Sequence, residues 1–227
     1  MDNEIITYLE LCQREKASLQ RGMNFKLFEN YSVILMSLRK NSPYQDEVID
    51  NGKSIIYEGH DKPRNECKNP KSEDQQSRSR TGRLTENGKF EKAVLDFKNG
   101  KDVPHKVKVY EKIKSGIWTY NGTFNLVDCY TTKQDNRMVF KFKLEITDDI
   151  DMQVQTRIRP RQNRVIPSWI KQQVYKRDQG KCVICGKNSE LHYDHDFPYS
   201  KGGTSITSNN IRLLCARHNL EKSAKIE

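Results

Sequence analysis

The chain of 227 residues lacks long apolar runs: 34% of its residues are hydrophobic and the mean hydropathy is -0.90. A membrane-spanning helix needs about 20 consecutive apolar residues, so the sequence excludes an integral helical membrane protein. No secretory signal pattern is present. Three of the six cysteines belong to a metal-binding pattern described below, and the other three, Cys12, Cys67 and Cys129, are widely spaced and odd in number, so no disulfide framework is expected. We therefore expect a cytoplasmic protein with reduced thiols and no membrane partner.

Acidic residues are in the minority. The chain has 40 Lys and Arg against 30 Asp and Glu, a net charge of +10 at pH 7. Most of the excess lies in residues 157–227, which hold 14 basic and 6 acidic residues. Such a basic segment favours a polyanionic partner, because Lys and Arg displace the counterions of a phosphate backbone.

Two pairs of metal-binding residues frame the C-terminal part of the sequence. Cys182 and Cys185 form the first pair, and Cys215 and His218 form the second, each with two residues between its members. Sulfur and imidazole ligands in two such pairs suit a tetrahedral structural zinc, since each pair can span one edge of the tetrahedron.

The 29 residues between the pairs are more than a simple zinc finger needs, and they hold a second polar set. Asp194 and His195 are adjacent, Asn210 follows, and Asn219 comes directly after the last zinc ligand. A carboxylate, an imidazole and two amides can bind a hard cation and deprotonate water.

The segment from about Arg164 to the C-terminus resembles the HNH nucleases, on "YDHDFPYSKGG", "SNNIRLLCARHNLEK" and the preceding "RVIPSWIKQQVYKRDQGKCVICG". The resemblance implies a zinc-clasped ββα-metal domain in which His195 activates water. Asn210 would orient the His195 ring. Asp194 and Asn219 would hold Mg or Mn. His218 stands where many members carry cysteine. The alternative is a plain zinc ribbon, and His192 is expected to be only a packing or surface histidine.

The N-terminal part is predicted to be rich in strands. Residues 4–18 predict an amphipathic helix from Ile5, Ile6, Leu9 and Cys12, and residues 85–100 predict a second helix capped by Thr85. Between and after them, "YSVILMS", "KSIIYEG", "HKVKVYEKI", "GIWTYNGTFNLVDCYT" and "RMVFKFKLEI" have strand patterns. Residues 60–82 form a long polar loop. A His60–Asp61 pair there is too weak to indicate a metal-dependent phosphohydrolase.

Residues from about Leu19 to Ile146 resemble the SRA (YDG-type) domain, which recognises modified cytosine in DNA, on "LQRGMNF", "PYQDEVIDNGKSIIYEG" and "WTYNGTFNLVDCY". Tyr120-Asn121-Gly122 replaces the motif that names the family. The resemblance implies a pocket for a flipped base in which Tyr44 and Tyr57 stack and Glu47, or Asp46 beside it, accepts from the amino group. Glu58 stands where members can carry threonine beside the base.

Together these features predict an α+β chain: a β-rich, PUA-type barrel of the SRA kind with an N-terminal helix (1–150), a linker (151–164) and an HNH domain (165–227). The predicted function is a modification-dependent, type IV-like DNA endonuclease of a prokaryotic-type cell. It would read 5-methyl- or 5-hydroxymethylcytosine in double-stranded DNA, with structural Zn and catalytic Mg or Mn, and act as a homodimer on DNA. The alternatives are a modified-DNA reader with only a zinc ribbon, and a homing or repair nuclease indifferent to modification.

Overall fold

The computed structural model describes residues 3–147, 165–196 and 207–224. The predicted linker, 151–164, lies outside the described residues, as does the end of the matched "YDHDFPYSKGG" segment, residues 197–203. Within the described ranges no helix has the length and apolar character that crossing a membrane requires.

The described strands form one sheet, in the order β10-β9-β1-β7-β6-β3-β2, with β8, β5 and β4 continuing from β7. Their bounds are β1 (Glu4–Thr7), β2 (Met23–Phe28), β3 (Tyr31–Met36), β4 (Glu47–Ile49), β5 (Ser54–Glu58), β6 (His105–Lys114), β7 (Ile117–Gln134), β8 (Arg137–Ile146), β9 (Leu191–His195) and β10 (Ile211–Cys215). The helices are α1 (Tyr8–Arg14), α2 (Glu86–Lys98), α3 (Ser168–Arg177) and α4 (Ala216–Ala224). The prediction of a β-rich chain with a few helices is confirmed.

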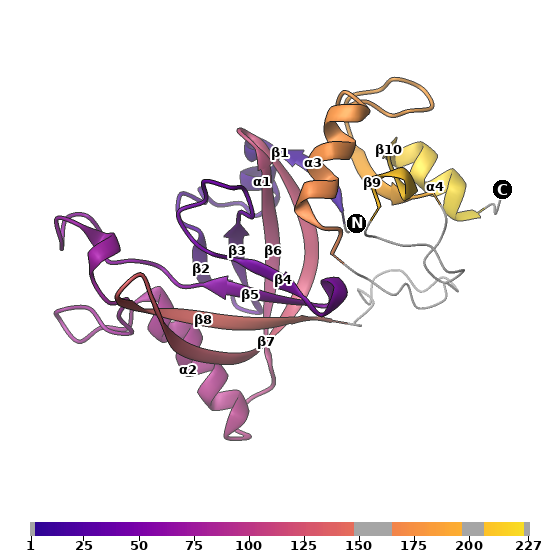
Figure 1. Ribbon diagram of the computed structural model, residues 1–227. Coiled ribbons are helices and arrows are strands. Elements are labelled where there is room, and N and C mark those ends of the chain that lie inside the picture. Colours follow the sequence, from indigo (N-terminus) through magenta and orange to yellow (C-terminus); the bar gives the residue numbers. More distant parts are fainter. Residues whose placement is uncertain (1–2, 148–164, 197–206, 225–227) are drawn as a thin grey trace.

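Strands β2 to β8 make up the larger part of the molecule (Figure 1). All their pairings are antiparallel except that of β3 with β6. The long β7 bends across the sheet and pairs with β6 along its first half and with β8 along its second. The curled sheet encloses an apolar core that includes Val107, Phe124, Phe142 and Leu144.

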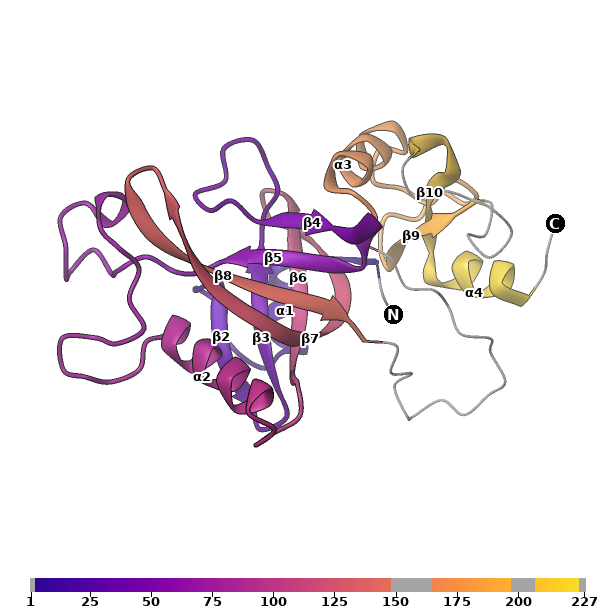
Figure 2. The same ribbon diagram turned by 60° about the horizontal axis from the view of Figure 1, so that its bottom comes forward.

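Helix α2 packs beneath this curled sheet (Figure 2). It begins as predicted, because the side chain of Thr85 accepts a hydrogen bond from the Gly88 N–H. Phe90 and Val94 point into the core, and the Phe90 ring packs against Phe142. The predicted helix over residues 85–100 is therefore confirmed.

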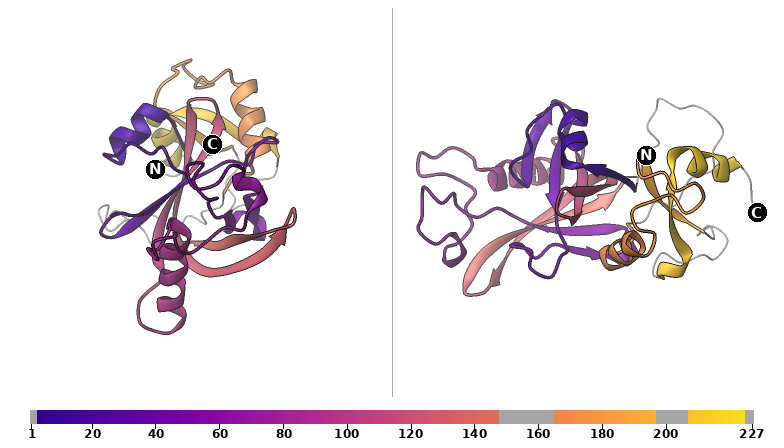
Figure 3. Two further views of the ribbon diagram at one scale, coloured as in Figure 1. Left: turned by 90° about the vertical axis from the view of Figure 1, so that its left-hand side faces the viewer. Right: turned by 90° about the horizontal axis from the view of Figure 1, so that it is seen from above.

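The C-terminal elements α3, β9, β10 and α4 lie side by side with the curled sheet at one end of the molecule (Figure 3). β9 and β10 pair antiparallel, from Ile211 opposite His195 to Cys215 opposite Leu191. Helix α3 and the hairpin enclose a separate apolar core with Ile170, Val174 and Leu213. The order strand, strand, helix from β9 to α4 is that of a ββα unit.

The predicted N-terminal helix is wrong in its first turn. Residues 4–7 form β1, and the helix starts only at Tyr8. Thr7 and Glu10 form a capping box that starts the helix there, with Thr7 N–H donating to Glu10 at 2.6 Å. The adjacent Ile5 and Ile6 fit a strand because both of its faces are covered.

The alternation of apolar and charged residues in "RMVFKFKLEI" predicts a half-buried strand, and β8 differs from this prediction. Phe140, Phe142 and Leu144 are buried as expected, but Lys141 on the opposite face is buried too. Its ammonium donates to Glu58 of β5 at 3.2 Å. The polar face of this hairpin thus covers part of the neighbouring strand.

Candidate functional site

A cavity of about 570 Å³ opens where the ends of β3 and β5 meet the loop before β4. Of the five predicted pocket residues, Tyr44, Asp46 and Tyr57 line this cavity. Glu47 and Glu58 are not among its lining residues: Glu47 is exposed at the start of β4, and Glu58 is fully buried. Successive residues of a strand face opposite sides, which separates Tyr57 from Glu58 on β5.

Asp46 is the acidic group of the cavity. Its carboxylate accepts hydrogen bonds from the Glu58 N–H at 3.0 Å and from the Ser37 N–H at 3.2 Å. Burial raises the pKa of this carboxyl to about 7, although the two N–H donors act in the opposite direction. The cavity therefore holds an acceptor whose position is set by the backbone of two strands.

The aromatic wall includes a residue that the sequence analysis did not place there. The His60 ring stacks on Tyr44 with centroids 5.4 Å apart, and its Nε2 lies 3.3 Å from the Tyr57 hydroxyl. Asn87 holds the His60 backbone through two hydrogen bonds of 2.8 Å. Burial lowers the pKa of His60 to about 4, so its imidazole is neutral at pH 7. Lys71 adds a cation–π contact to the Tyr44 ring, 4.1 Å from its centroid.

Gly22 leaves the space between these rings open. A Cβ at this position would lie 2.8 Å from both the Tyr57 hydroxyl and His60 Nε2. Any larger residue would therefore press on the aromatic wall. In the sequence, Gly22 stands inside the matched "LQRGMNF" segment, which was the available signal for it.

Glu58 lies behind the cavity in a buried charged cluster. It pairs with Arg137 at 3.3 Å and with Lys141 at 3.2 Å, and it accepts from the Gln45 N–H at 2.8 Å. Arg137 also pairs with Asp61 at 2.5 Å. This cluster fixes the β7–β8 hairpin to the segment that carries Tyr44 and His60.

The four predicted zinc ligands come together. The ligand atoms of Cys182, Cys185, Cys215 and His218 all lie within 4.8 Å of one another. Cys185 Sγ and Cys215 Sγ are 3.8 Å apart, and His218 Nδ1 is 3.3 Å from Cys215 Sγ. A tetrahedral zinc with Zn–S bonds of about 2.3 Å places two sulfurs about 3.8 Å apart, so the residues fit this ion.

The local backbone prepares Cys182 for this role. Burial alone would raise the pKa of its thiol, but hydrogen bonds to backbone groups of Cys215, Cys185 and Ile184 lower that pKa to about 6. The Gly186 N–H donates to the Cys182 carbonyl at 2.8 Å and closes the turn between the first two ligands. A thiolate is the form that binds zinc.

Asp194 and His195 end β9, next to α4, which carries Asn219. Asn210 lies just before β10, and its carbonyl accepts from the Asp196 N–H at 2.7 Å, which closes the hairpin beside His195. Burial lowers the pKa of His195, which favours a neutral imidazole, while Asp194 acts in the opposite direction. Asp194, His195 and Asn210 thus lie on one hairpin, and α4, the helix that carries Asn219, packs against it.

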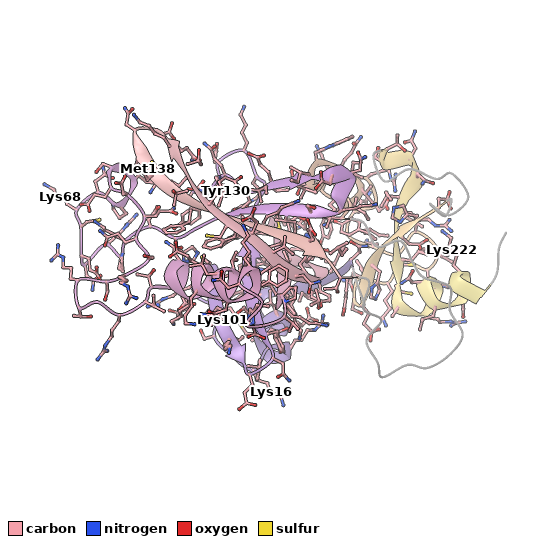
Figure 4. The ribbon with its side chains drawn as sticks, turned by 90° about the horizontal axis from the view of Figure 1, so that it is seen from below. Lys16, Lys68, Lys101, Tyr130, Met138 and Lys222 are labelled. Atoms are coloured by element: carbon pink, nitrogen blue, oxygen red, sulfur yellow. The ribbon has the colours of Figure 1, made fainter. Side chains whose placement is uncertain are left out.

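The Asp194 carboxylate and the His195 carbonyl both contact the ammonium of a lysine side chain. Lys222 of α4 pairs with Asp194 at 2.5 Å and also donates to the His195 carbonyl. Its ammonium lies 3.9 Å from Asp196 as well. Lys222 lies near one end of the molecule and Lys68 near the other (Figure 4). A carboxylate and a carbonyl that hold an ammonium are also the donor types that a hard divalent cation prefers.

No family model and no curated protein sequence matches the chain. Among solved structures, it is similar to the SUVH5 SRA domain in complex with fully methylated CG DNA (20% identity, 63% of this chain, 85% of that chain, TM-score 0.43). It is also similar to SUVH5 SRA bound to fully hydroxymethylated CG DNA (19%, 68%, 89%, 0.44) and to the DNA modification-dependent restriction endonuclease AspBHI (14%, 61%, 37%, 0.44). With TM-scores below 0.5, these likenesses do not by themselves assign a function to the chain.

Proposed function

We propose that this protein is a DNA endonuclease that reads a modified cytosine, 5-methyl or 5-hydroxymethyl, and hydrolyses the backbone nearby. One observation carries the proposal. The same chain holds an aromatic cavity with a buried carboxylate, Asp46, and a ββα unit that presents Asp194 and His195 beside a Cys3His cluster.

The cavity suits a base taken out of the stack. A flipped pyrimidine needs aromatic faces and an acceptor for its exocyclic amine. Tyr44, Tyr57 and His60 supply the rings, and the Asp46 carboxylate supplies the acceptor. Glu47 and Glu58 lie outside the cavity lining, so in this proposal neither touches the base. Glu58 supports the wall by accepting from the Gln45 N–H beside Tyr44.

The ββα unit suits phosphodiester hydrolysis. Cys182, Cys185, Cys215 and His218 would hold a structural zinc. Asp194 and Asn219 would hold Mg or Mn, which when bound supplies positive charge to the scissile phosphate. His195 takes a proton from the attacking water, and Asn210 keeps its ring in place.

Replacing His195, the proposed general base, tests the nuclease half of the proposal. His195→Ala should lower the cleavage rate of modified DNA roughly a hundredfold to ten-thousandfold, because a positioned base contributes about that much. DNA affinity, measured by fluorescence anisotropy, should stay unchanged. His105→Ala is the control, since His105 lies in the other part of the molecule and contacts Ser32. If His195→Ala cleaves as fast as the parent protein, His195 is not the base.

Cleavage of differently modified DNA duplexes distinguishes the proposed function from its two alternatives. Unmodified, methylated, hydroxymethylated and glucosylated duplexes are incubated with Mg, Mn or chelator and resolved on one gel. A reader with only a zinc ribbon binds modified DNA and cuts none of them. A homing or repair nuclease cuts unmodified DNA as fast as methylated DNA.

A further inference from the structure

Strand β1 is shared by the two parts of the molecule. On one side Ile5 pairs with Thr119 of β7, and on the other it pairs with Leu191 of β9. Asn3 extends the bridge, because its N–H donates to the Tyr120 carbonyl at 2.7 Å and its carbonyl accepts from the Tyr193 N–H at 3.1 Å. The hairpin that carries Asp194 and His195 is thus hydrogen-bonded through β1 to the cavity-bearing sheet.

Two pairs of adjacent residues link the separate apolar cores. Ile6 belongs to the cluster under α1, whereas Ile5 packs against the C-terminal core. Val165 lies in the core of the curled sheet, and the next residue, Ile166, lies in the C-terminal core. The Val165 N–H also donates to the Gly52 carbonyl at 2.9 Å. Rotation of one part against the other would pull these neighbours out of two packed interiors.

A buried ion pair joins the parts at a third place. Lys171 of α3 donates to Glu111 of β6 at 2.7 Å, and both side chains are fully buried. The Asn121 amide satisfies both partners: its oxygen accepts from Lys171 at 2.6 Å, and its nitrogen donates to Glu111 at 3.0 Å. Ser168 donates to the other Glu111 oxygen. A buried pair with this many partners tolerates little displacement.

The ion pair is also connected to the catalytic hairpin. The Tyr193 hydroxyl donates to the Lys171 carbonyl at 2.9 Å, and Tyr193 lies two residues before His195 on β9. On the cavity side of β1, Trp118 of β7 pairs with Ile6 and also lines the cavity. The contacts therefore run without a break from the cavity wall to the hairpin.

We propose that β1 and the Glu111–Lys171 pair hold the hairpin of Asp194 and His195 at one position relative to the cavity, so that the protein cuts at one set distance from the modified base. The inference rests on the proposed function. Lys171 and Glu111 are positioning residues, since both are buried between the parts. The covalent connection through residues 148–164 is then not what sets the distance.

An insertion distinguishes a cut distance set by β1 and the Glu111–Lys171 pair from one set by the covalent connection through residues 148–164. Ten Gly and Ser residues are added after Asp151, and cuts on a duplex with a single modified cytosine are mapped to the nucleotide. The wild-type protein and the insertion variant should cut at the same position or pair of positions. A tether of this length would let an otherwise free domain reach many sites, so a spread of cuts over several nucleotides in the insertion variant overturns the proposal.

The ion pair is tested with a matched substitution on the same helix. Lys171→Met leaves Glu111 buried without its charge partner and should spread the cut positions. Lys176→Met, at an exposed position of α3, should cut as the wild type does. Adding Glu111→Gln to Lys171→Met removes the unpaired charge and should narrow the pattern again. Wild-type cut positions in Lys171→Met would overturn the role of the pair.

Hydrogen exchange tests the same coupling without cleavage. The Tyr193 N–H, which donates to Asn3, should exchange at least tenfold faster in Lys171→Met than in wild type or Lys176→Met. If the wild-type protein proves unable to cut DNA, the proposed function fails while this measurement still decides the coupling. Unchanged exchange at Tyr193 would overturn the coupling in either case.

Discussion

At the residue scale, the cavity depends on which neighbour in a pair of acids faces inward. The sequence offered Asp46 and Glu47 together, and the structure places only Asp46 against the cavity. The Ser37 and Glu58 N–H groups hold its carboxylate, and they lie 9 residues before it and 12 residues after it, outside the segment that carries the two acids. Local pattern cannot choose between two adjacent acids when their partners come from elsewhere in the chain.

The titration of Asp46 should be visible in DNA binding. Burial raises the pKa of its carboxyl to about 7, so the carboxylate form increases between pH 6 and pH 8. A carboxylate accepts more strongly from an amine than a neutral acid does, so affinity for modified DNA should rise roughly threefold to tenfold over that range. Fluorescence anisotropy at constant ionic strength measures it.

The control for this prediction is Asp46→Asn, whose affinity should not vary in this way. The charges of Glu58 and Lys141 act on the pKa of Asp46. Burial and the Asp46 charge together raise the pKa of Tyr57, so Tyr57 does not titrate in this range. His60, with a pKa of about 4, stays neutral throughout. A flat profile for the wild-type protein would contradict the role of Asp46 as acceptor.

At the element scale, α1 and β1 show which elements a local sequence pattern can predict and which it cannot. The Thr7-x-x-Glu10 capping box marks the start of α1, so the sequence itself contains the signal that the helix begins at Tyr8. That Ile5 and Ile6 form a strand between β7 and β9 depends on two partners more than 100 residues away in sequence. A strand of four residues has too weak a pattern to reveal them.

The ββα unit should depend on zinc while the curled sheet does not. Cys215→Ser removes a predicted ligand at the end of β10, so the protein should lose one equivalent of zinc and the packing of α3, β9 and α4. Zinc content is measured by atomic emission, and folding by amide exchange in each part. Cys129→Ser, in β7, is the control and should keep the metal.

Exchange protection in β6 and Phe142 of β8 should persist in Cys215→Ser, because their core contains none of the four ligands. Retention of one zinc per chain by Cys215→Ser would contradict the ligand assignment. Loss of protection throughout the sheet would instead show that the two parts fold as one cooperative unit.

At the scale of the whole molecule, the chain holds one candidate catalytic region among its described residues, around Asp194 and His195. One such centre cuts one strand, so a double-strand break requires a second copy. We therefore expect a homodimer on DNA, detected by sedimentation velocity with a labelled duplex. The rate of double-strand breaks should rise more steeply than linearly with protein concentration. Breaks in both strands within a single turnover of a strictly monomeric protein would contradict this expectation.

The sequence by itself determined what short spacing and periodicity encode. The two ligand pairs, the capped helix α2 and the alternating strands each depend on residues a few positions apart, so their pattern survives without knowledge of the fold. Tertiary structure alone decided which acid faces the cavity, that His60 completes its wall, and that β1 and Glu111–Lys171 join the two parts. Those features depend on buried contacts between different elements of the chain, from 9 residues apart at Asp46 to more than 100 at β1, where the energy of a charge or a strand edge is set by its partner.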